Sequence, residues 1–383
     1  MSLPLPVQPK SPVVLEDVLR DIRARRAEFE KLTYVPLDIV EMLQAVGVYR
    51  AFVPAEFGGD AIGPADFCRL IERIAMADAS TGWVASFGVS ATYLAALPRE
   101  TFAAIYGKDP NTVFAGAIFP PQAAERVAGG FKVTGRWPYC SGCMGASLIG
   151  AGIRVDDGGP SAGLPRMAVM PRGKISIKHT WETVGLAATG SHDIVAEGVV
   201  VPEEWTFVRG GKPQRDDPVF RYPSLALASQ VLAVVALGTA REALDWVHAE
   251  AAGAASITGA PSIAARPHIQ SELARAEAKL RGARGFFYDT IEEAWQAVLA
   301  GDAVSQELHV RLRLAATQAA HEGADVARMA YFMGGSSAIR KGHLLVRCMT
   351  DAAAVAQHAF LGTGTWTAAG AAMLHQPATP GFP

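Results

Sequence analysis

The spacing of apolar residues changes twice along this chain, and this change constrains the fold more than any other feature of the sequence. Between residues 14 and 104 apolar side chains recur every three or four positions, as in a helix, and Gly47 follows one such run as a plausible helix end. That run contains Ile39, Met42, Leu43 and Val46. The first part of the chain is therefore predicted to be helical.

Between residues 112 and 208 short runs rich in β-branched residues replace the helical pattern. They are TVFAGAI, FKVTGRW, ASLIGAGI, MAVM, KISIK and VAEGVVV. Turns rich in Gly and Pro, such as DDGGPSAGLP, separate them. This spacing predicts an antiparallel sheet or barrel.

After the loop RGGKPQRDDP the helical pattern returns. One face of a predicted long helix carries Leu273, Ala276, Leu280, Phe287, Ile291, Trp295 and Val298. The segment AASITGAPSIAARP contains Gly and Pro and is predicted to be a loop between two helices. The sequence thus predicts a multidomain α+β protein with an N-terminal helical domain (1–111), a central antiparallel β domain (112–216) and a C-terminal helical bundle (217–383).

Composition limits the possible partners. The formal net charge is −2, so nothing indicates a basic surface for nucleic acid. The most apolar stretch, 225–240, contains Ser229 and Gln230 and is shorter than the roughly 20 residues of a membrane span, so a buried helix is expected. The N-terminus lacks the pattern of a signal peptide. These features predict a cytoplasmic protein that acts on a small molecule, without nucleic-acid or membrane partners.

The cysteines indicate neither disulfides nor a metal site. Cys68, Cys140, Cys143 and Cys348 are too few and too scattered for a disulfide framework and are expected to be reduced. Cys140 and Cys143 form one CxxC, but no second CxxC or HxxxH follows at zinc spacing. No GxGxxG fingerprint follows a predicted strand, which argues against a nicotinamide-binding domain.

Four segments occur in the order found in the acyl-CoA dehydrogenase superfamily, which this chain resembles over nearly its whole length. They are VPAEFGG, ERIAMADASTGW, GRWPYCSGC and TVGLAATGSHDIVAEGVVVP. The resemblance implies a flavin between the β domain and the C-terminal bundle, and a homotetramer whose neighbouring subunits help to bind it. Because this fold hosts dehydrogenases, oxidases and monooxygenases, the site must separate these activities.

The segment RCMTDAAAVAQHAFLG carries that distinction. Dehydrogenases of the family have a catalytic glutamate in this region, whereas here no carboxylate follows Asp351. Instead His358 stands seven residues after Asp351, similar to the "R-D-x-x-x-x-x-x-H" run of the flavin monooxygenases that include the p-hydroxyphenylacetate and dibenzothiophene oxygenases. Thr350 replaces the arginine of that run. The resemblance implies the oxygenase component of a two-component monooxygenase.

Such an oxygenase takes O2 and reduced FMN or FAD from a separate flavin reductase, and it oxygenates a small substrate through a flavin C4a-hydroperoxide. The family most often oxidises aromatic or heteroaromatic compounds. The sequence does not identify the substrate and leaves FMN and FAD open. Two alternatives also stay open: an acyl-CoA dehydrogenase or oxidase with tightly bound FAD, and a non-catalytic member of the fold.

Ser141 and His358 are the predicted catalytic residues. Ser141 matches the family's Ser or Thr that approaches flavin N5 and O4, where a hydroxyl can donate and accept hydrogen bonds. His358 is expected either to deprotonate the substrate or to donate a hydrogen bond to the distal peroxide oxygen. Asp351, two helical turns away on roughly the same face, is too far to orient His358 and is expected to pack the helix or contact the flavin neighbourhood.

Other site residues are assigned by position. Trp137 and Tyr139 alternate along the strand that leads to Ser141, so all three are expected to face the flavin. The alternative is that the two aromatic residues belong to the β-domain core, and for Tyr139 the sequence does not decide between the two. The predicted flavin-binding residues are Trp137, Tyr139, Cys140, Ser141, Gly142, Thr189, Ser191, Gly334 and Gly335. The last two end a helix and suit a phosphate or a neighbouring subunit's flavin tail. The predicted substrate-binding residues are Trp83, Phe87 and His358. His192 and Asp193 are not expected to form a catalytic pair.

Overall fold

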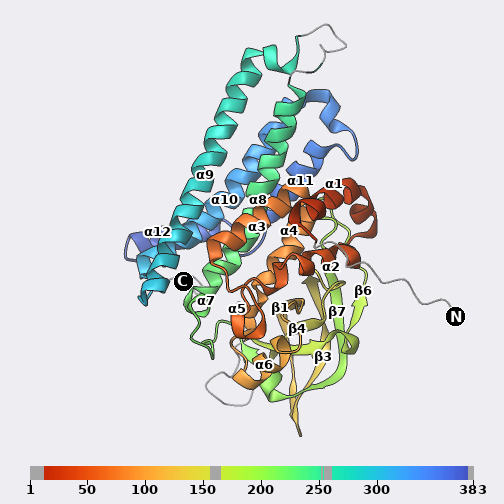
Figure 1. Cartoon of the computed structure of the whole chain (residues 1–383), viewed down its shortest axis with the longest axis vertical. Helices are drawn as coiled ribbons and strands as arrows, with labels where there is room; N and C mark the ends of the chain where they lie inside the picture. The colour runs from red at the N-terminus through yellow and green to blue at the C-terminus, as the bar shows by residue number, and fades with distance from the viewer. Residues whose placement is uncertain (1–12, 156–164, 252, 254–260, 378–383) are drawn as a thin grey trace, which may run out of the picture.

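Along the chain a β domain stands between two helical regions, and in space the N-terminal helices α1, α3 and α4 lie beside the C-terminal helices at one end of the β domain (Figure 1). The computed structural model describes residues 13–155, 165–251, 253 and 261–377. The N-terminal region has six helices, namely α1 Leu15–Leu32, α2 Leu37–Ala45, α3 Pro64–Ala77, α4 Ala79–Ala85, α5 Ser90–Leu94 and α6 Arg99–Tyr106. Short 3-10 helices occur at η1 Val48–Arg50, η2 Ala55–Phe57 and η3 Ser86–Val89. The helical prediction for the first part of the chain is confirmed.

The central region folds into two four-stranded sheets. One has the order β1-β4-β5-β8, with β1 Phe114–Ala123, β4 Leu148–Arg154, β5 Arg166–Pro171 and β8 Thr206–Val208. The other has the order β2-β3-β7-β6, with β2 Glu125–Val127, β3 Gly130–Cys140, β7 His192–Val201 and β6 Ser176–Lys178. All six predicted runs are strands, while the turn DDGGPSAGLP lies almost wholly outside the described residues.

The β domain is not purely antiparallel, because β1 and β4 run parallel. Between them the chain enters the second sheet, where β2 pairs with β3, and then returns. That detour lets β4 re-enter the first sheet in the direction of β1. The prediction of an antiparallel domain was therefore wrong for this pair of strands.

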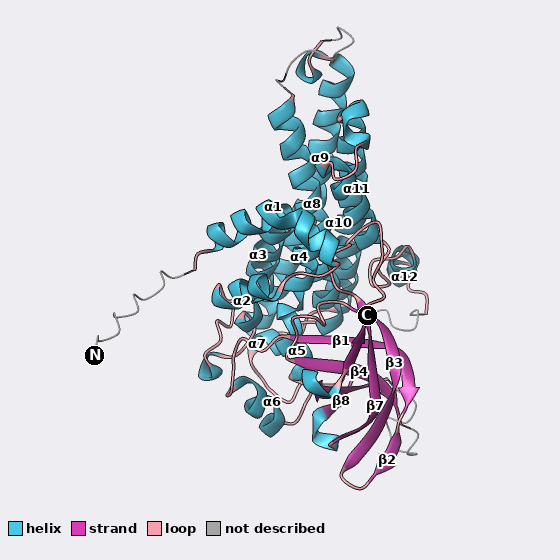
Figure 2. Ribbon diagram, turned by 90° about the vertical axis from the view of Figure 1, so that its right-hand side faces the viewer, coloured by secondary structure: helices cyan, strands magenta, loops and turns pink. Residues whose placement is uncertain are grey.

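The C-terminal region is a bundle of long helices that extends away from the sheets (Figure 2). Its helices are α7 Pro218–Arg221, α8 Ser224–Glu250, α9 Pro267–Ala300, α10 Gln306–Met333, α11 Leu344–Ala356 and α12 Gly364–Met373. The face predicted for α9 is buried or half-buried throughout. The predicted loop AASITGAPSIAARP lies partly outside the described residues, and its described part contains the 3-10 helix η6 Ile263–Ala265. A further 3-10 helix, η7 Gly335–Ile339, follows α10.

Helix α8 forms the core of the bundle. Among the described residues, α8 is the one helix that is long and apolar enough to cross a membrane, but 83% of its most apolar stretch is buried inside the protein. Gly238 brings α8 close to α3, since a Cβ at this position would lie 2.4 Å from the carbonyl oxygen of Glu72. Helix α8 is therefore a buried core helix, as its sequence predicted.

The proposed domain boundaries near residues 111 and 216 remain predictions. The strand β1 begins at Phe114 and the helix α7 at Pro218, so each proposed boundary lies in a connection between elements of different type.

Candidate active site

A cavity of about 900 Å³ lies where the helical regions meet the β domain. Helices α4, α5, α8 and α11, strands β1 and β8, and the segment 181–191 all contribute to its wall. Its aromatic lining consists of Trp83, Phe87, Tyr93, Phe114, Phe119, Tyr139, Trp181, Phe207 and Phe360. A large, mostly apolar cavity with a few convergent polar groups is typical of a site for a cofactor and a small-molecule substrate.

Three of the predicted residues form a chain of hydroxyl groups on one wall of the cavity. The Ser141 and Ser191 hydroxyl oxygens are 2.6 Å apart, and those of Ser191 and Thr189 are also 2.6 Å apart. Thr189 donates to the carbonyl oxygen of Leu186 (3.0 Å), and the Trp83 indole N–H donates to Ser141 (3.2 Å). The structure thus brings together residues that the sequence suggested separately.

Residues on either side of Ser141 hold it in place. Gly142 has φ 73°, which favours glycine, and its N–H donates to the carbonyl oxygen of Thr189 (2.9 Å). Cys140 is a fully buried free thiol. Neither Cys140 nor Gly142 lines the cavity, so both support Ser141 from outside it.

The expected alternation of Trp137, Tyr139 and Ser141 on one face was wrong. Trp137 is fully buried, its indole N–H donates to the carbonyl oxygen of Gly152 (2.7 Å), and it does not line the cavity. Tyr139 is 71% exposed, has φ 61° and does line it. The pairing of β3 with β7 shifts register between Trp137 and Cys140, and this bulge interrupts the two-residue period.

His358 was expected to share a helical face with Asp351. It lies beyond the end of α11, so that prediction was wrong. Its Nδ1 accepts a hydrogen bond from the backbone N–H of Phe360 (3.2 Å), which leaves the proton of the neutral ring on Nε2. The ring contacts Trp83 edge-on, with centroids 5.5 Å apart. Burial lowers the pKa of His358 to about 4, so the imidazole is neutral near pH 7.

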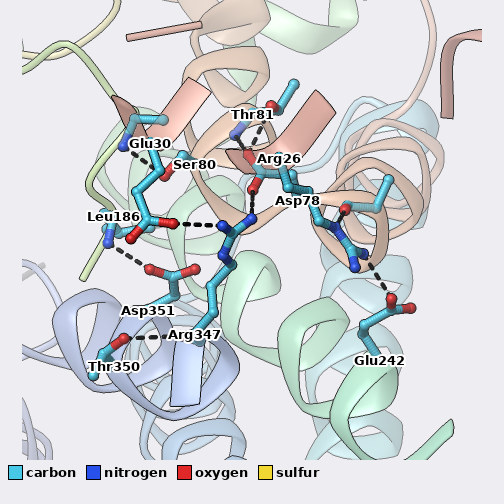
Figure 3. Close-up of polar contacts among 12 residues, drawn as sticks. Arg26, Glu30, Asp78, Ser80, Thr81, Leu186, Glu242, Arg347, Thr350 and Asp351 are labelled. Atoms are coloured by element: carbon cyan, nitrogen blue, oxygen red, sulfur yellow. Dashed lines mark hydrogen bonds and ion pairs between the residues drawn. The ribbon is translucent and has the colours of Figure 1, made fainter. Parts of the chain in front are cut away.

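Asp351 holds the backbone of the segment that carries Thr189 and Ser191 (Figure 3). Its Oδ1 accepts a hydrogen bond from Leu186 N–H (2.6 Å), and Leu186 has φ 51°. Burial and the neighbouring Asp78 carboxylate raise the pKa of Asp351 to about 7, partly offset by that hydrogen bond. Asp351 thus packs α11 against the segment 181–191, and a role near a bound flavin stays a prediction.

An ionic cluster lies behind this segment (Figure 3). It consists of Arg26, Glu30, Asp78, Glu242 and Arg347. Arg347 pairs with Glu30 and lies 3.8 Å from Asp78, while Arg26 pairs with Glu242 at 2.6 Å. Each of these side chains is thus held by a partner of opposite charge.

The remaining predicted residues lie in different places. Trp83 and Phe87 both line the cavity. Gly334 caps α10, Gly335 opens the next turn, and neither lines this cavity, so a role at a neighbouring subunit's flavin stays a prediction.

His192 and Asp193 do not form a pair. His192 Nδ1 accepts from the backbone N–H groups of Thr180 and Trp181, and Asp193 pairs with Arg136. His192 thereby fixes the chain next to Trp181, which is part of the cavity wall.

Among the cavity residues that sequence reasoning missed are Tyr93, Trp181 and Arg209. Trp181 stands two residues before the start of the segment TVGLAATGSHD, so its position was available as a signal. Tyr93 and Arg209 belong to no recognisable motif.

Comparisons with known proteins give the family. Models of the acyl-CoA dehydrogenase N-terminal and C-terminal domains match residues 14–100 and 230–363. An indole-3-acetate monooxygenase of Pseudomonas putida is 55% identical, over 96% of this chain and 94% of that protein. One of Acinetobacter baumannii is 46% identical, over 97% and 96%. The crystal structure of 3-HSA hydroxylase from Rhodococcus sp. RHA1 superposes with a TM-score of 0.88, at 26% identity over 97% of this chain and 98% of that one.

The chain therefore belongs to the acyl-CoA dehydrogenase family. Within that family it is an oxygenase component of a two-component monooxygenase that uses reduced flavin and O2. A flavin reductase is accordingly its functional partner.

Proposed function

We propose that this chain adds one oxygen atom from O2 to indole-3-acetate or a closely related aromatic acid. The observation that carries this proposal is a cavity rich in aromatic side chains, with Ser141 and His358 in its wall, in a chain 55% identical to an indole-3-acetate monooxygenase. Aromatic walls suit a flat aromatic ring, which they contact by stacking and edge-to-face packing.

The donor set of the cavity fits a flavin. One wall offers the hydroxyls of Ser141, Thr189 and Ser191 within an otherwise apolar surface, as a flat ring with one polar edge requires. Reduced flavin, when bound, supplies the two electrons that split O2 into the oxygen atom added to the substrate and a molecule of water. Ser141 would contact the N5 and O4 edge of the ring, and the apolar walls would exclude water from the reaction.

The hydroxyl groups of Ser141, Ser191 and Thr189 can donate their hydrogen bonds in either direction along the chain. In one arrangement Ser141 donates to Ser191, Ser191 to Thr189, and Thr189 to the carbonyl oxygen of Leu186. In the reverse arrangement Thr189 donates to Ser191, Ser191 to Ser141, and Ser141 into the cavity. Leu186 O stays satisfied in both, because it also accepts from the Trp181 indole (2.9 Å). Ser141 can therefore donate to the flavin edge without leaving a buried polar group unpaired.

His358 acts as a hydrogen-bond donor at the reacting oxygen. Its Nδ1 is occupied by the N–H of Phe360, so Nε2 carries the proton and no free lone pair remains on the ring. With its pKa lowered to about 4 by burial, the ring keeps this neutral form through the physiological range. This geometry favours donation over proton abstraction.

We also propose that the enzyme acts in the cytoplasm as a homotetramer. Large apolar side chains are exposed at Phe332 and Ile339, close to the glycines that end α10, and at Met373 and Leu374. Apolar side chains gathered at the surface are typical of subunit contacts. Light scattering coupled to gel filtration tests the subunit number.

Reconstitution tests the function. Purified protein is mixed with a flavin reductase, NADH, FMN or FAD, and indole-3-acetate, and the product is analysed by mass spectrometry with 18O2. We expect one labelled oxygen atom in the product, and no useful NADH oxidation when the reductase is left out. Absence of labelled product with either flavin would contradict the proposed substrate.

A further inference from the structure

Arg209 is the one side chain of fixed charge among the described residues that line the cavity. His358 and Tyr93, which also line the cavity, carry no charge near neutrality, since burial keeps His358 unprotonated and raises the pKa of Tyr93 above its usual value. A guanidinium in such a wall attracts an anion strongly, because the surroundings screen charge poorly.

The protein fixes both ends of Arg209. It directly follows β8, and its backbone N–H donates to the carbonyl oxygen of Pro165 (3.2 Å). Its guanidinium carbon lies 4.2 Å from the centroid of the Tyr93 ring on α5. A guanidinium stacked on an aromatic face keeps its N–H groups free at the edge, where they can bind a carboxylate in a two-point contact.

Among the described residues, no carboxylate pairs with Arg209. Other arginines of the β domain do have such partners, for example Arg136 with Asp193. A half-buried cation without a counter-ion is unfavourable unless a ligand supplies the charge.

Arg209 and the pair Ser141 and His358 lie in different parts of the cavity wall. Helices α4, η3 and α5 follow one another without a break from Ala79 to Leu94. With a rise of about 1.5 Å per residue in the α-helical turns and about 2.0 Å in the 3-10 turn, Trp83 and Tyr93 are separated by about 17 Å along this run, before their side chains reach into the cavity. Trp83 contacts Ser141 and His358, whereas Tyr93 contacts Arg209. The cation therefore lies away from the proposed point of oxygen transfer.

We infer that Arg209 binds the carboxylate of the aromatic acid and so selects acids over neutral compounds with the same ring. This inference rests on the proposed function, because it assumes that the substrate ring lies near His358. Loss of a two-point, charged hydrogen bond should raise KM for the acid about 10- to 100-fold.

The test compares ligands that differ only in the carboxylate. Indole-3-acetate is paired with 3-methylindole, and 4-hydroxyphenylacetate with 4-methylphenol. KM, kcat and binding by titration calorimetry are measured for the wild type and for Arg209→Gln. Arg166→Gln is the matched control, because Arg166 also stacks on an aromatic ring, that of Phe131, but does not line the cavity.

We expect Arg209→Gln to lose most of the preference for the acid while binding the neutral ligand as before, and Arg166→Gln to keep that preference. Unchanged binding of the neutral ligand also shows that the cavity is folded. Should Arg209→Gln fail to fold, Arg209→Lys keeps the charge and replaces the two-point contact by a single one, so the acid preference should fall by about 3- to 10-fold.

Two results would overturn the inference: a wild type without acid preference in either pair, or a variant of Arg209 that keeps the full preference. If the wild type prefers the acid only in the phenol pair and oxygenates neither indole, the proposed substrate fails while the role of Arg209 stands. The failure of one proposal can thus be told from that of the other.

Discussion

The segment 181–191 lies between two polar clusters of opposite character. On its cavity side, Ser141, Ser191 and Thr189 form a chain of neutral hydroxyls in which each oxygen can donate or accept. On its other side, Arg347 and its acidic partners form pairs whose donors and acceptors are fixed. The two clusters therefore differ in what they can do. The hydroxyl chain can reverse the direction of its hydrogen bonds without moving a heavy atom, whereas the ionic cluster holds the backbone of the segment in place.

The largest effect should come from His358 in the cavity wall. His358→Ala should lower the rate of substrate oxygenation by 10²- to 10⁴-fold, the usual range for such assistance, while affinity for reduced flavin stays nearly intact. Rapid-mixing measurements of product formation and flavin binding give both values. His358→Asn should keep much of the activity if the ring only donates a hydrogen bond. Wild-type rates for His358→Ala across pH 6 to 9 would mean that the histidine is only a core residue.

Removal of the hydroxyl at the end of the chain should have the next largest effect. Ser141→Ala removes one hydrogen bond to the flavin edge, worth about 1–3 kcal/mol, so hydrogen peroxide formed per product should rise about 10- to 100-fold. Ser147→Ala is the matched control, since Ser147 donates to the carbonyl oxygen of Val113 and does not line the cavity. Equal peroxide yields for Ser141→Ala and the wild type would remove Ser141 from the mechanism.

A smaller effect should test whether the chain reverses. Thr189→Val keeps the shape of the side chain but removes the proton that enters the chain from Thr189 in the reverse arrangement. Ser141 can still donate, but less favourably, so peroxide formed per product should rise only about 3- to 10-fold. An effect as large as that of Ser141→Ala would instead indicate that Thr189 contacts the flavin directly.

The smallest effect on turnover is expected from a change at Asp351, which holds the segment 181–191 through Leu186. Asp351→Asn keeps an oxygen that accepts from Leu186 N–H, so activity at pH 7 should stay within about threefold of the wild type. The pH dependence of stability should change. In the folded protein the raised pKa of about 7 makes Asp351 hold its proton, whereas the unfolded chain releases it near pH 4.

Wild-type stability therefore loses up to about 1.4 kcal/mol per pH unit from this group as pH rises towards 7, and Asp351→Asn lacks that loss. Urea unfolding of both proteins at pH 5, 6, 7 and 8 measures the difference. Between pH 4 and 6.5 the depressed pKa of His358 works in the opposite direction, which is why the comparison with the variant is needed. Parallel stability curves for the two proteins would show that Asp351 is ionised throughout.

Much of the fold could be predicted because the changes in apolar period are long-range features of the sequence. The six β runs and the buried helix 225–240 each extend over enough residues for the period to identify them. The parallel pairing of β1 with β4 could not be predicted, because the direction of β4 depends on which sheet the chain enters between these two strands.

The candidate site was predicted only in part. Ser141, Thr189, Ser191 and His358 stand in segments that resemble those of the family, and all four line the cavity. The orientation of Trp137 was predicted wrongly because the sequence gives no sign of the bulge that interrupts the alternation of side chains along β3. Arg209 was missed because a single arginine next to a glycine-rich loop is indistinguishable, in sequence, from a surface residue.

The bulge in β3 has a consequence for how relatives of this chain should be aligned. Because the strand slips register between Trp137 and Cys140, the spacing from the buried tryptophan to Ser141 sets the side of the strand on which the hydroxyl emerges. Substitutions within that interval leave this spacing unchanged, whereas an insertion or deletion of one residue should turn the serine away from the flavin. A gap between Trp137 and Ser141 in an alignment would therefore mark a protein that has lost oxygenase chemistry, even where all neighbouring residues are identical.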